Sequence, residues 1–130
     1  MNGLTSVASS FGPEETMARL AAEIRAHGMI VFARIDHSAS AAEAGLTLLP
    51  TELIIFGNAR AGTPLMQAEQ TVGIDLPLKA LVWQNAARKT WLSYNEPGWI
   101  VERHAVANAE VIVNNMAAVL TTIARKAAGL

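Results

Sequence analysis

The chain has 130 residues, of which 52% are hydrophobic and 16% charged, and its formal net charge is -1. This length and composition predict a single globular domain over residues 1–130 that needs no disulfide or structural metal to hold its core. The sequence contains no cysteine, which excludes disulfide frameworks, cysteine-ligated zinc and cysteine nucleophiles. The near-neutral charge, with no basic run longer than Arg125-Lys126, argues against nucleic-acid binding.

Two features of the chain bear on membranes and location. The longest apolar run, residues 29–33, is far shorter than the roughly 20 residues that a membrane-spanning helix needs. The first ten residues lack the basic segment and long apolar stretch of a secretory signal. We therefore expect a cytoplasmic protein that does not span a membrane.

The first part of the chain predicts an edge strand, a helix and a central strand. Scattered apolar residues within positions 4–11 predict the edge strand. Pro13 and apolar residues at intervals of three and four predict a helix that ends at Gly28. The apolar run at residues 29–35 is too short for a helix and rich in strand-forming residues, so it predicts a central strand.

The middle of the chain predicts two more helices and three more strands. An alanine-rich stretch at residues 38–44 predicts a short helix, and the apolar residues 53–56 predict a buried strand. Thr63-Pro64 suits the N-cap and first turn of the next helix. Residues 78–83 and 90–94 are strand candidates at hairpin spacing, so they are expected to pair antiparallel.

The last part of the chain predicts a turn followed by a long helix. Residues 95–98 are rich in turn formers, and Asn108 is a good N-cap for the final helix. One apolar stripe of that helix consists of Ile112, Met116, Val119, Ile123 and Ala127. A second apolar edge, made by Val111, Val113 and Leu120, predicts contact with a second subunit as well as with the sheet.

Five strands with three or four helices predict an α/β or α+β two-layer sandwich. The expected sheet is mixed, because the chain combines an early crossover with a later hairpin. The helices are expected to pack mainly on one face of this sheet.

A set of short motifs between residue 28 and His104 resembles the family known as Domain of Unknown Function 302. The motifs are Asp36-His37, Gly45-Leu46, Pro50-Thr51-Glu52-Leu53, Phe56-Gly57-Asn58, Gly62-Thr63-Pro64-Leu65-Met66, Asp75-Leu76-Pro77-Leu78-Lys79, Tyr94-Asn95 and Arg103-His104. The resemblance implies a small, mainly prokaryotic α/β two-layer domain that tends to form dimers. The chain departs from the family that it resembles at Ala59, where many members have proline after the Gly-Asn pair.

Asp36 and His37 directly follow a predicted strand, where a rigid scaffold often presents side chains to a ligand. His37 could serve as a general base or a metal ligand near neutral pH, with a carboxylate fixing its tautomer. The structural alternative is a hydrogen bond that caps the next loop. The sequence leaves both interpretations open.

The segment from Gly57 to Pro64 has the strand, glycine-rich loop and helix order of a phosphate-binding loop. It lacks the lysine and the Ser or Thr that such a loop requires, which argues against nucleotide hydrolysis. Asn58 and Arg60 could still hold a small anion together with backbone N–H groups. The alternative is a tight turn that simply needs two glycines.

Asp75 and Lys79 are four residues apart in a stretch predicted to be extended, and an ion pair between them is the favoured interpretation. If both side chains face a cleft instead, Lys79 could bind an anion or act as a base or nucleophile. Tyr94 ends the next predicted strand. Its phenol could donate to an oxyanion or satisfy a backbone carbonyl.

His104 follows Arg103 and belongs to the same motif set. His37, His104 and an acidic residue could bind a first-row metal, although no HxH or HExxH spacing supports such a site. His27 is predicted to be a surface residue at a helix end, outside the site. The sequence identifies no cofactor.

The leading hypothesis is a homodimer that binds a small anionic or metal-containing ligand in a polar cleft. The candidate catalytic residues are His37, Lys79 and Tyr94, and the candidate ligand-binding residues are Asp36, Asn58, Arg60, Asp75 and His104. One alternative is a small enzyme with His37 as general base. Another is a structural or protein-interaction domain without a ligand.

Overall fold

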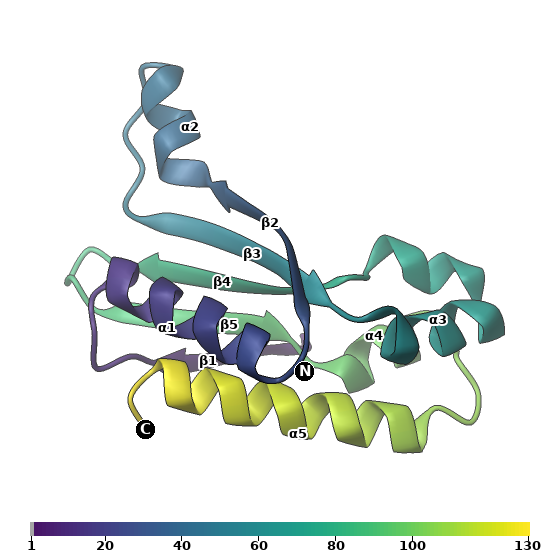
Figure 1. The fold of residues 1–130 in the computed structure, drawn as a ribbon. Coiled ribbons are helices and arrows are strands. Elements are labelled where there is room, and N and C mark those ends of the chain that lie inside the picture. Colours follow the sequence, from purple (N-terminus) through teal and green to yellow (C-terminus); the bar gives the residue numbers. More distant parts are fainter. Residues whose placement is uncertain (1) are drawn as a thin grey trace.

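The structure is a computed structural model that describes residues 2–130 (Figure 1). Its five strands form one sheet in the order β1-β5-β4-β3-β2, and every neighbouring pair is antiparallel. The strands are β1 (Leu4–Ala8), β2 (Ile30–Asp36), β3 (Thr51–Gly57), β4 (Leu78–Gln84) and β5 (Thr90–Asn95). The helices are α1 (Pro13–Ala26), α2 (His37–Glu43), α3 (Ala59–Ala68), α4 (Pro97–Arg103) and α5 (Glu110–Ala127), with a 3-10 turn η1 (Gln70–Ile74).

The predicted α+β fold with helices mainly on one face of a five-stranded sheet is confirmed, with two differences in the sheet itself. The sheet is antiparallel rather than mixed, because β2 to β5 follow one another as antiparallel neighbours and β1 pairs antiparallel with β5. The run at residues 29–35 was expected to be central but forms the edge strand β2. Its apolar composition indicated burial, whereas most of its side chains are exposed within this chain.

The hydrophobic core lies between one face of the sheet and the two helices α1 and α5. Because side chains alternate between the two faces of a strand, every second residue of β3, β4 and β5 contributes to this core. The contributing residues are Ile54, Phe56, Leu78, Ala80, Val82, Leu92 and Tyr94 from the sheet, with Met17, Leu20, Ile24, Leu120 and Ile123 from the helices. This face positions β3 and α5, which form two walls of the candidate site.

The opposite face of the sheet carries half-buried apolar side chains at its centre. Trp83 and Trp91 stack with their ring centroids 6.2 Å apart, and the Trp83 indole N–H donates to Ser93 Oγ at 2.9 Å. A shallow hollow of about 340 Å³ on this face is lined by residues that include Leu53, Lys79 and Trp83. This face is therefore apolar but less enclosed than the core.

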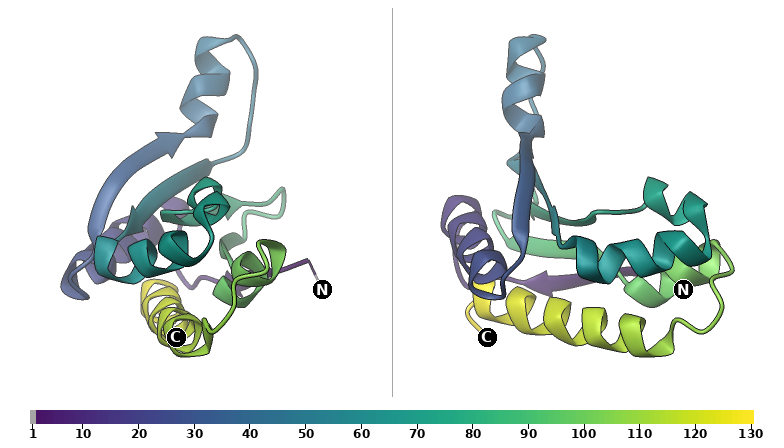
Figure 2. Two further views of the ribbon diagram at one scale, coloured as in Figure 1. Left: turned by 90° about the vertical axis from the view of Figure 1, so that its right-hand side faces the viewer. Right: turned by 45° about the vertical axis from the view of Figure 1, so that its right-hand side comes forward.

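A long arm, residues 30–50, projects from the body of the molecule and consists of β2, α2 and the connection to β3 (Figures 1 and 2). No residue of α2 is buried. The arm exposes six large apolar side chains, which are Ile30, Phe32, Ile35, Leu46, Leu48 and Leu49. Contacts within this chain therefore leave most of the arm uncovered.

Three helix boundaries differ from those that the sequence predicts. Asn58, rather than Thr63, caps α3, so the helix begins five residues earlier than Pro64 suggested. Residues 95–98 were expected to form a turn, but residues 97–103 form the short helix α4, with Pro97 in its first turn. Asn108 has a positive φ of 56° and is not the N-cap of α5, which is Ala109.

The final helix α5 has one core face and one partly open edge. Leu120, which the sequence placed on an edge for a second subunit, is buried in the core. Val111 is highly exposed and Val113 is half-buried. Within residues 2–130, neither α5 nor another helix is long and apolar enough to cross a membrane.

Candidate functional site

The main candidate site is a cavity of about 650 Å³ at the end of β3, between the start of β2 and the helices α3 and α5. Its wall is mainly apolar, and polar side chains are few. The apolar wall includes Met29, Phe32, Met66, Leu78, Met116 and Val119. A volume in this range is typical of sites for small molecules.

The end of β3 and the start of α3 form one side of the cavity because of a local helix cap. Asn58 has an extended backbone, and its Oδ1 accepts a hydrogen bond from the Ala61 N–H at 2.9 Å. This N-cap starts α3 directly after the strand, as asparagine commonly does. As a result, the first turn of α3, from Ala59 to Thr63, lies along the cavity.

Two cationic or ionisable side chains lie among the residues that line the cavity. Arg60 comes from the first turn of α3, and His27 is the C-cap residue of α1. The His27 ring is held through Nδ1, which lies 2.8 Å from the backbone oxygen of Glu23. Since the carbonyl oxygen can only accept, Nδ1 carries the proton and Nε2 is left for another partner.

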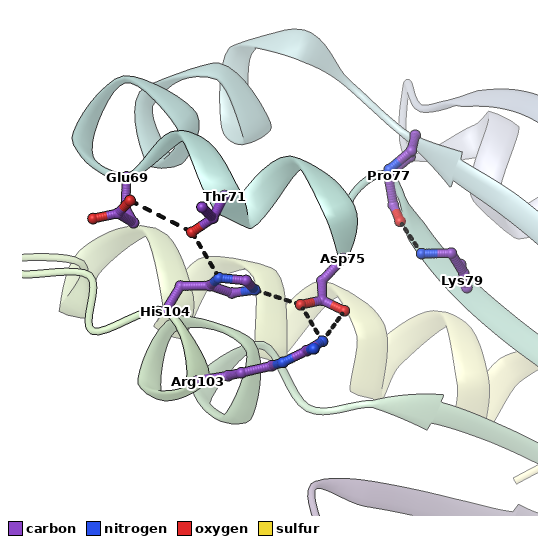
Figure 3. A network of polar contacts seen from close by, with 7 residues as sticks. All are labelled: Glu69, Thr71, Asp75, Pro77, Lys79, Arg103 and His104. Atoms are coloured by element: carbon purple, nitrogen blue, oxygen red, sulfur yellow. Dashed lines mark hydrogen bonds and ion pairs between the residues drawn. The ribbon is translucent and has the colours of Figure 1, made fainter.

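A second polar cluster connects η1 with the end of α4 (Figure 3). His104 Nε2 lies 2.5 Å from Asp75 Oδ2, and Nδ1 lies 2.9 Å from Thr71 Oγ1. The Arg103 guanidinium donates to both oxygens of Asp75, at 3.0 and 2.9 Å. Because Asp75 directly precedes the cavity-lining residues 76–78, this cluster holds one cavity wall against α4.

The Asp75 cluster is largely shielded from solvent. The side chains of His104 and Asp75 are 8% and 13% exposed. Burial opposes ionisation of Asp75, but the hydrogen bond from His104 and the charge of Arg103 outweigh it and hold the pKa of Asp75 below its usual value. The carboxylate is therefore stabilised in its charged form.

We expect Asp75→Asn to lower the free energy of unfolding by about 1–2 kcal/mol near neutral pH, because the variant loses charge-assisted hydrogen bonds in a shielded place. A group whose pKa is lowered by folding contributes stability above its unfolded pKa, about 3.9, and loses it as pH falls through the folded value. The difference between variant and wild type should therefore shrink at about pH 3. Urea unfolding at both pH values measures it, and an equal difference at both would contradict a role for the charge.

The residues that the sequence proposed for a single cleft lie in four separate places. Asn58 and Arg60 line the cavity. Asp75 and His104 form the adjacent cluster, which confirms that they are close but not that they bind a ligand. Lys79 and Tyr94 belong to β4 and β5, and Asp36 and His37 belong to the arm.

The predicted ion pair between Asp75 and Lys79 is wrong. Asp75 is not in an extended stretch, as the prediction assumed, but follows η1 with φ -102° and ψ 0°. It pairs with Arg103 and His104, whereas Lys79 Nζ donates to the backbone oxygen of Pro77 at 3.3 Å (Figure 3).

Tyr94 belongs to the core of the molecule. Its side chain is in the cluster formed with α1 and α5, and its hydroxyl hydrogen-bonds with Thr121. Burial raises the pKa of Tyr94, and the nearby charge of Glu96 adds to the effect. The environment is that of a core tyrosine with a satisfied hydroxyl.

Asp36 and His37 lie at the junction of β2 and α2, in the arm. Asp36 caps α2, since Oδ1 accepts from the Ala39 N–H at 3.0 Å and from Ser38 Oγ at 2.7 Å. These hydrogen bonds lower the pKa of Asp36. His37 is exposed.

The arm places Asp36 and His37 away from the cavity. Asp36 pairs with Glu52 at one end of β3, whereas Gly57 at the other end leads into the cavity. Seven strand residues separate these ends by roughly 20 Å. Among residues 2–130, no group of three potential metal-ligating side chains is present.

Sequence reasoning missed the apolar part of the site. It placed His27 at the surface at a helix end, which the structure confirms, but did not associate it with the cavity. The wall residues Met29, Leu78 and Met116 come from three separate parts of the chain. In the sequence, each of them has the pattern of an ordinary core residue. The signal for His27 is its position at a helix end directly before a strand that borders the cavity. That signal becomes informative only once the neighbouring elements are placed.

Comparison with known proteins gives relatives in Brucella. The chain is 46% identical over 129 residues to the protein named fluoride-specific ion channel FluC 1 of Brucella suis biovar 1 (strain 1330), covering 98% of this chain and 51% of that protein. It is also 46% identical to a protein of the same name in Brucella abortus biovar 1 (strain 9-941), covering 98% of this chain and 48% of that protein. The chain therefore spans about half the length of the curated relatives it matches.

A solved structure has the same fold. The crystal structure of an uncharacterised conserved DUF302 protein from Bacillus stearothermophilus superimposes with a TM-score of 0.88, at 20% identity, over 98% of this chain and 99% of that one. The family model described as "Domain of unknown function DUF302" matches residues 5–123, which is most of the chain. The protein therefore belongs to the DUF302 family, as the motifs between residue 28 and His104 indicated.

Proposed function

We propose that this protein binds a small molecule in the cavity between β2, α3 and α5. The single observation that carries the proposal is the cavity itself, whose volume of about 650 Å³ suits a small ligand and whose wall is mainly apolar. Apolar contacts supply affinity, and the few polar groups supply orientation. The site proposed here is thus an apolar cavity with polar residues His27, Asn58, Arg60, Thr63 and Asn115 in its lining, and it differs from the polar cleft expected from the sequence.

The arrangement favours binding over catalysis by His37. A general base must come within hydrogen-bond reach of the proton that it removes, and nucleophile and base must meet at one substrate. His37 is exposed on the arm, Tyr94 is in the core, and Lys79 donates to a backbone oxygen. Lys79 and Tyr94 both line the shallow hollow of about 340 Å³, but His37 does not, so an enzyme with His37 as its general base has no geometric support.

The binding proposal predicts saturable uptake of a neutral apolar probe. We expect 1-aminoanthracene to bind with one molecule per chain and to increase in fluorescence as it leaves water. At a free concentration 100 times its dissociation constant, a ligand adds about 2.7 kcal/mol to the free energy of unfolding, so the melting temperature should also rise. Fluorescence that increases linearly without saturation, together with an unchanged melting temperature, would count against the proposal.

We also propose that the protein is a homodimer that buries the arm. β2 is an edge strand whose outer side has no partner strand among the described residues, and α2 is a seven-residue helix with no buried residue, so contacts within this chain stabilise the arm little. The arm exposes six large apolar side chains, among them Ile35 at 39% and Leu48 at 46%. A second copy brings the same apolar surface, and two-fold symmetry covers both arms at once.

The name of the Brucella relatives does not extend to this chain. The chain matches only about half of each relative, so the channel activity in that name is not part of the function proposed here. A cytoplasmic location remains a prediction from the sequence.

A further inference from the structure

The charge on the cavity lining is positive. Among the described residues that line it, the only formally charged side chain is Arg60, and neither aspartate nor glutamate is present. The nearest recorded carboxylate is that of Glu23, whose Oε2 lies 3.8 Å from Nδ1 of the lining residue His27. Anionic ligands are therefore favoured over cationic ones.

The two groups come from different elements and differ in what they offer an anion. Arg60 has no ion-pair partner within residues 2–130, and it lies in the first turn of α3, whose N-terminal end is electropositive. His27 is oriented through Nδ1, which leaves Nε2 without a hydrogen bond among the described residues. A carboxylate at Arg60 would meet a fork of N–H donors, whereas the neutral imidazole of His27, with its proton on Nδ1, presents Nε2 as an acceptor.

The rest of the wall suits a flexible apolar tail. Three of the five methionines of the chain, Met29, Met66 and Met116, line the cavity. Methionine side chains are unbranched and polarizable, so they adapt to tails of different shape. Leu78 and Val119 complete an apolar surface that offers a tail few hydrogen-bonding groups.

We infer that the ligand of this cavity is an amphiphilic monoanion, specifically an aliphatic carboxylate, with its acid group at Arg60 and its tail among the methionines. This inference rests on the proposed function, because it names the ligand class of the same cavity. Each methylene group that enters the cavity should tighten binding about fourfold. Octanoate should therefore bind roughly 15-fold more tightly than hexanoate, because its tail has two more methylene groups.

The test compares octanoate with its neutral counterpart octan-1-ol by isothermal titration calorimetry, in the wild type and in two arginine variants. Arg60→Gln keeps a polar side chain but removes the charge. Arg125→Gln removes one charge from an exposed position of α5 that does not line the cavity, so it controls for net charge. We expect the ratio of octanoate affinity to octanol affinity to fall about tenfold in Arg60→Gln and to stay within twofold in Arg125→Gln.

The possible failures of this experiment are distinguishable. If both compounds bind the wild type and Arg60→Gln leaves the affinity ratio unchanged, the anionic ligand class is wrong while the cavity remains a binding site. If neither compound nor 1-aminoanthracene binds the wild type, the proposed function itself is wrong and the inference falls with it. Equal affinities for hexanoate and octanoate would contradict a tail held in the cavity.

Discussion

A protein in which Ile35 and Leu48 are both replaced by glutamate is expected to be a monomer under conditions where the wild type is a dimer. Both side chains are large, apolar and exposed on the arm. In the proposed dimer they are covered, and covering a carboxylate without a partner costs several kcal/mol. Sedimentation velocity over a range of concentrations measures the change, because the wild type should approach twice the mass of the variant.

Val111→Glu provides the matched control for this dimer prediction. Val111 is 74% exposed on α5, outside the arm, and belongs to the edge that the sequence suggested for a second subunit. If the arm forms the interface, Val111→Glu remains a dimer. A wild type that sediments as a monomer at all concentrations would contradict the homodimer, and dissociation by Val111→Glu alone would place its interface on α5.

The largest expected effect on ligand binding comes from Ala61→Trp. Ala61 is half-buried on α3 and lines the cavity, so an indole at this position occupies space that a ligand needs. We expect binding of 1-aminoanthracene to weaken by more than tenfold, since the displaced apolar contacts are worth more than about 1.4 kcal/mol. A fluorescence titration measures the loss.

Ala68→Trp controls for the substitution itself. Ala68 lies on the same helix but is exposed and does not line the cavity. Circular dichroism and melting temperature show whether each variant keeps the fold, so a loss of binding by unfolding is recognised. Equal affinities in Ala61→Trp and Ala68→Trp, with both variants folded, would mean that the probe binds elsewhere.

Much of the fold was predictable because short-range patterns carry it. The apolar run at residues 53–56 identified the strand around Ile54, hairpin spacing identified the strand around Leu92, and the helical stripe through Met116 and Ile123 identified α5. The edge position of β2 was not predictable from its composition. A strand that is apolar because it faces a second subunit has the same sequence pattern as one buried under its own helices.

The candidate site was predictable only in part, for a related reason. Asn58 and Arg60 were found because a glycine-rich loop after a strand is a local signal. Asp75 and His104 were found as motifs, but their pairing depends on η1 and α4 meeting in three dimensions. Lys79 was assigned the wrong partner because the alternation rule was applied to Asp75, which lies in a turn.

The central claim is that the cavity between β2, α3 and α5 is the ligand site, and the methionine methyl groups test it directly. In a protein labelled with carbon-13 at these methyl groups, Met29, Met66 and Met116 report on the cavity, whereas Met17 is fully buried in the main core and does not line it. During a titration with 1-aminoanthracene, the NMR signals of the three cavity methionines should shift while that of Met17 stays in place. Saturable binding that leaves all three cavity signals unchanged would contradict the claim.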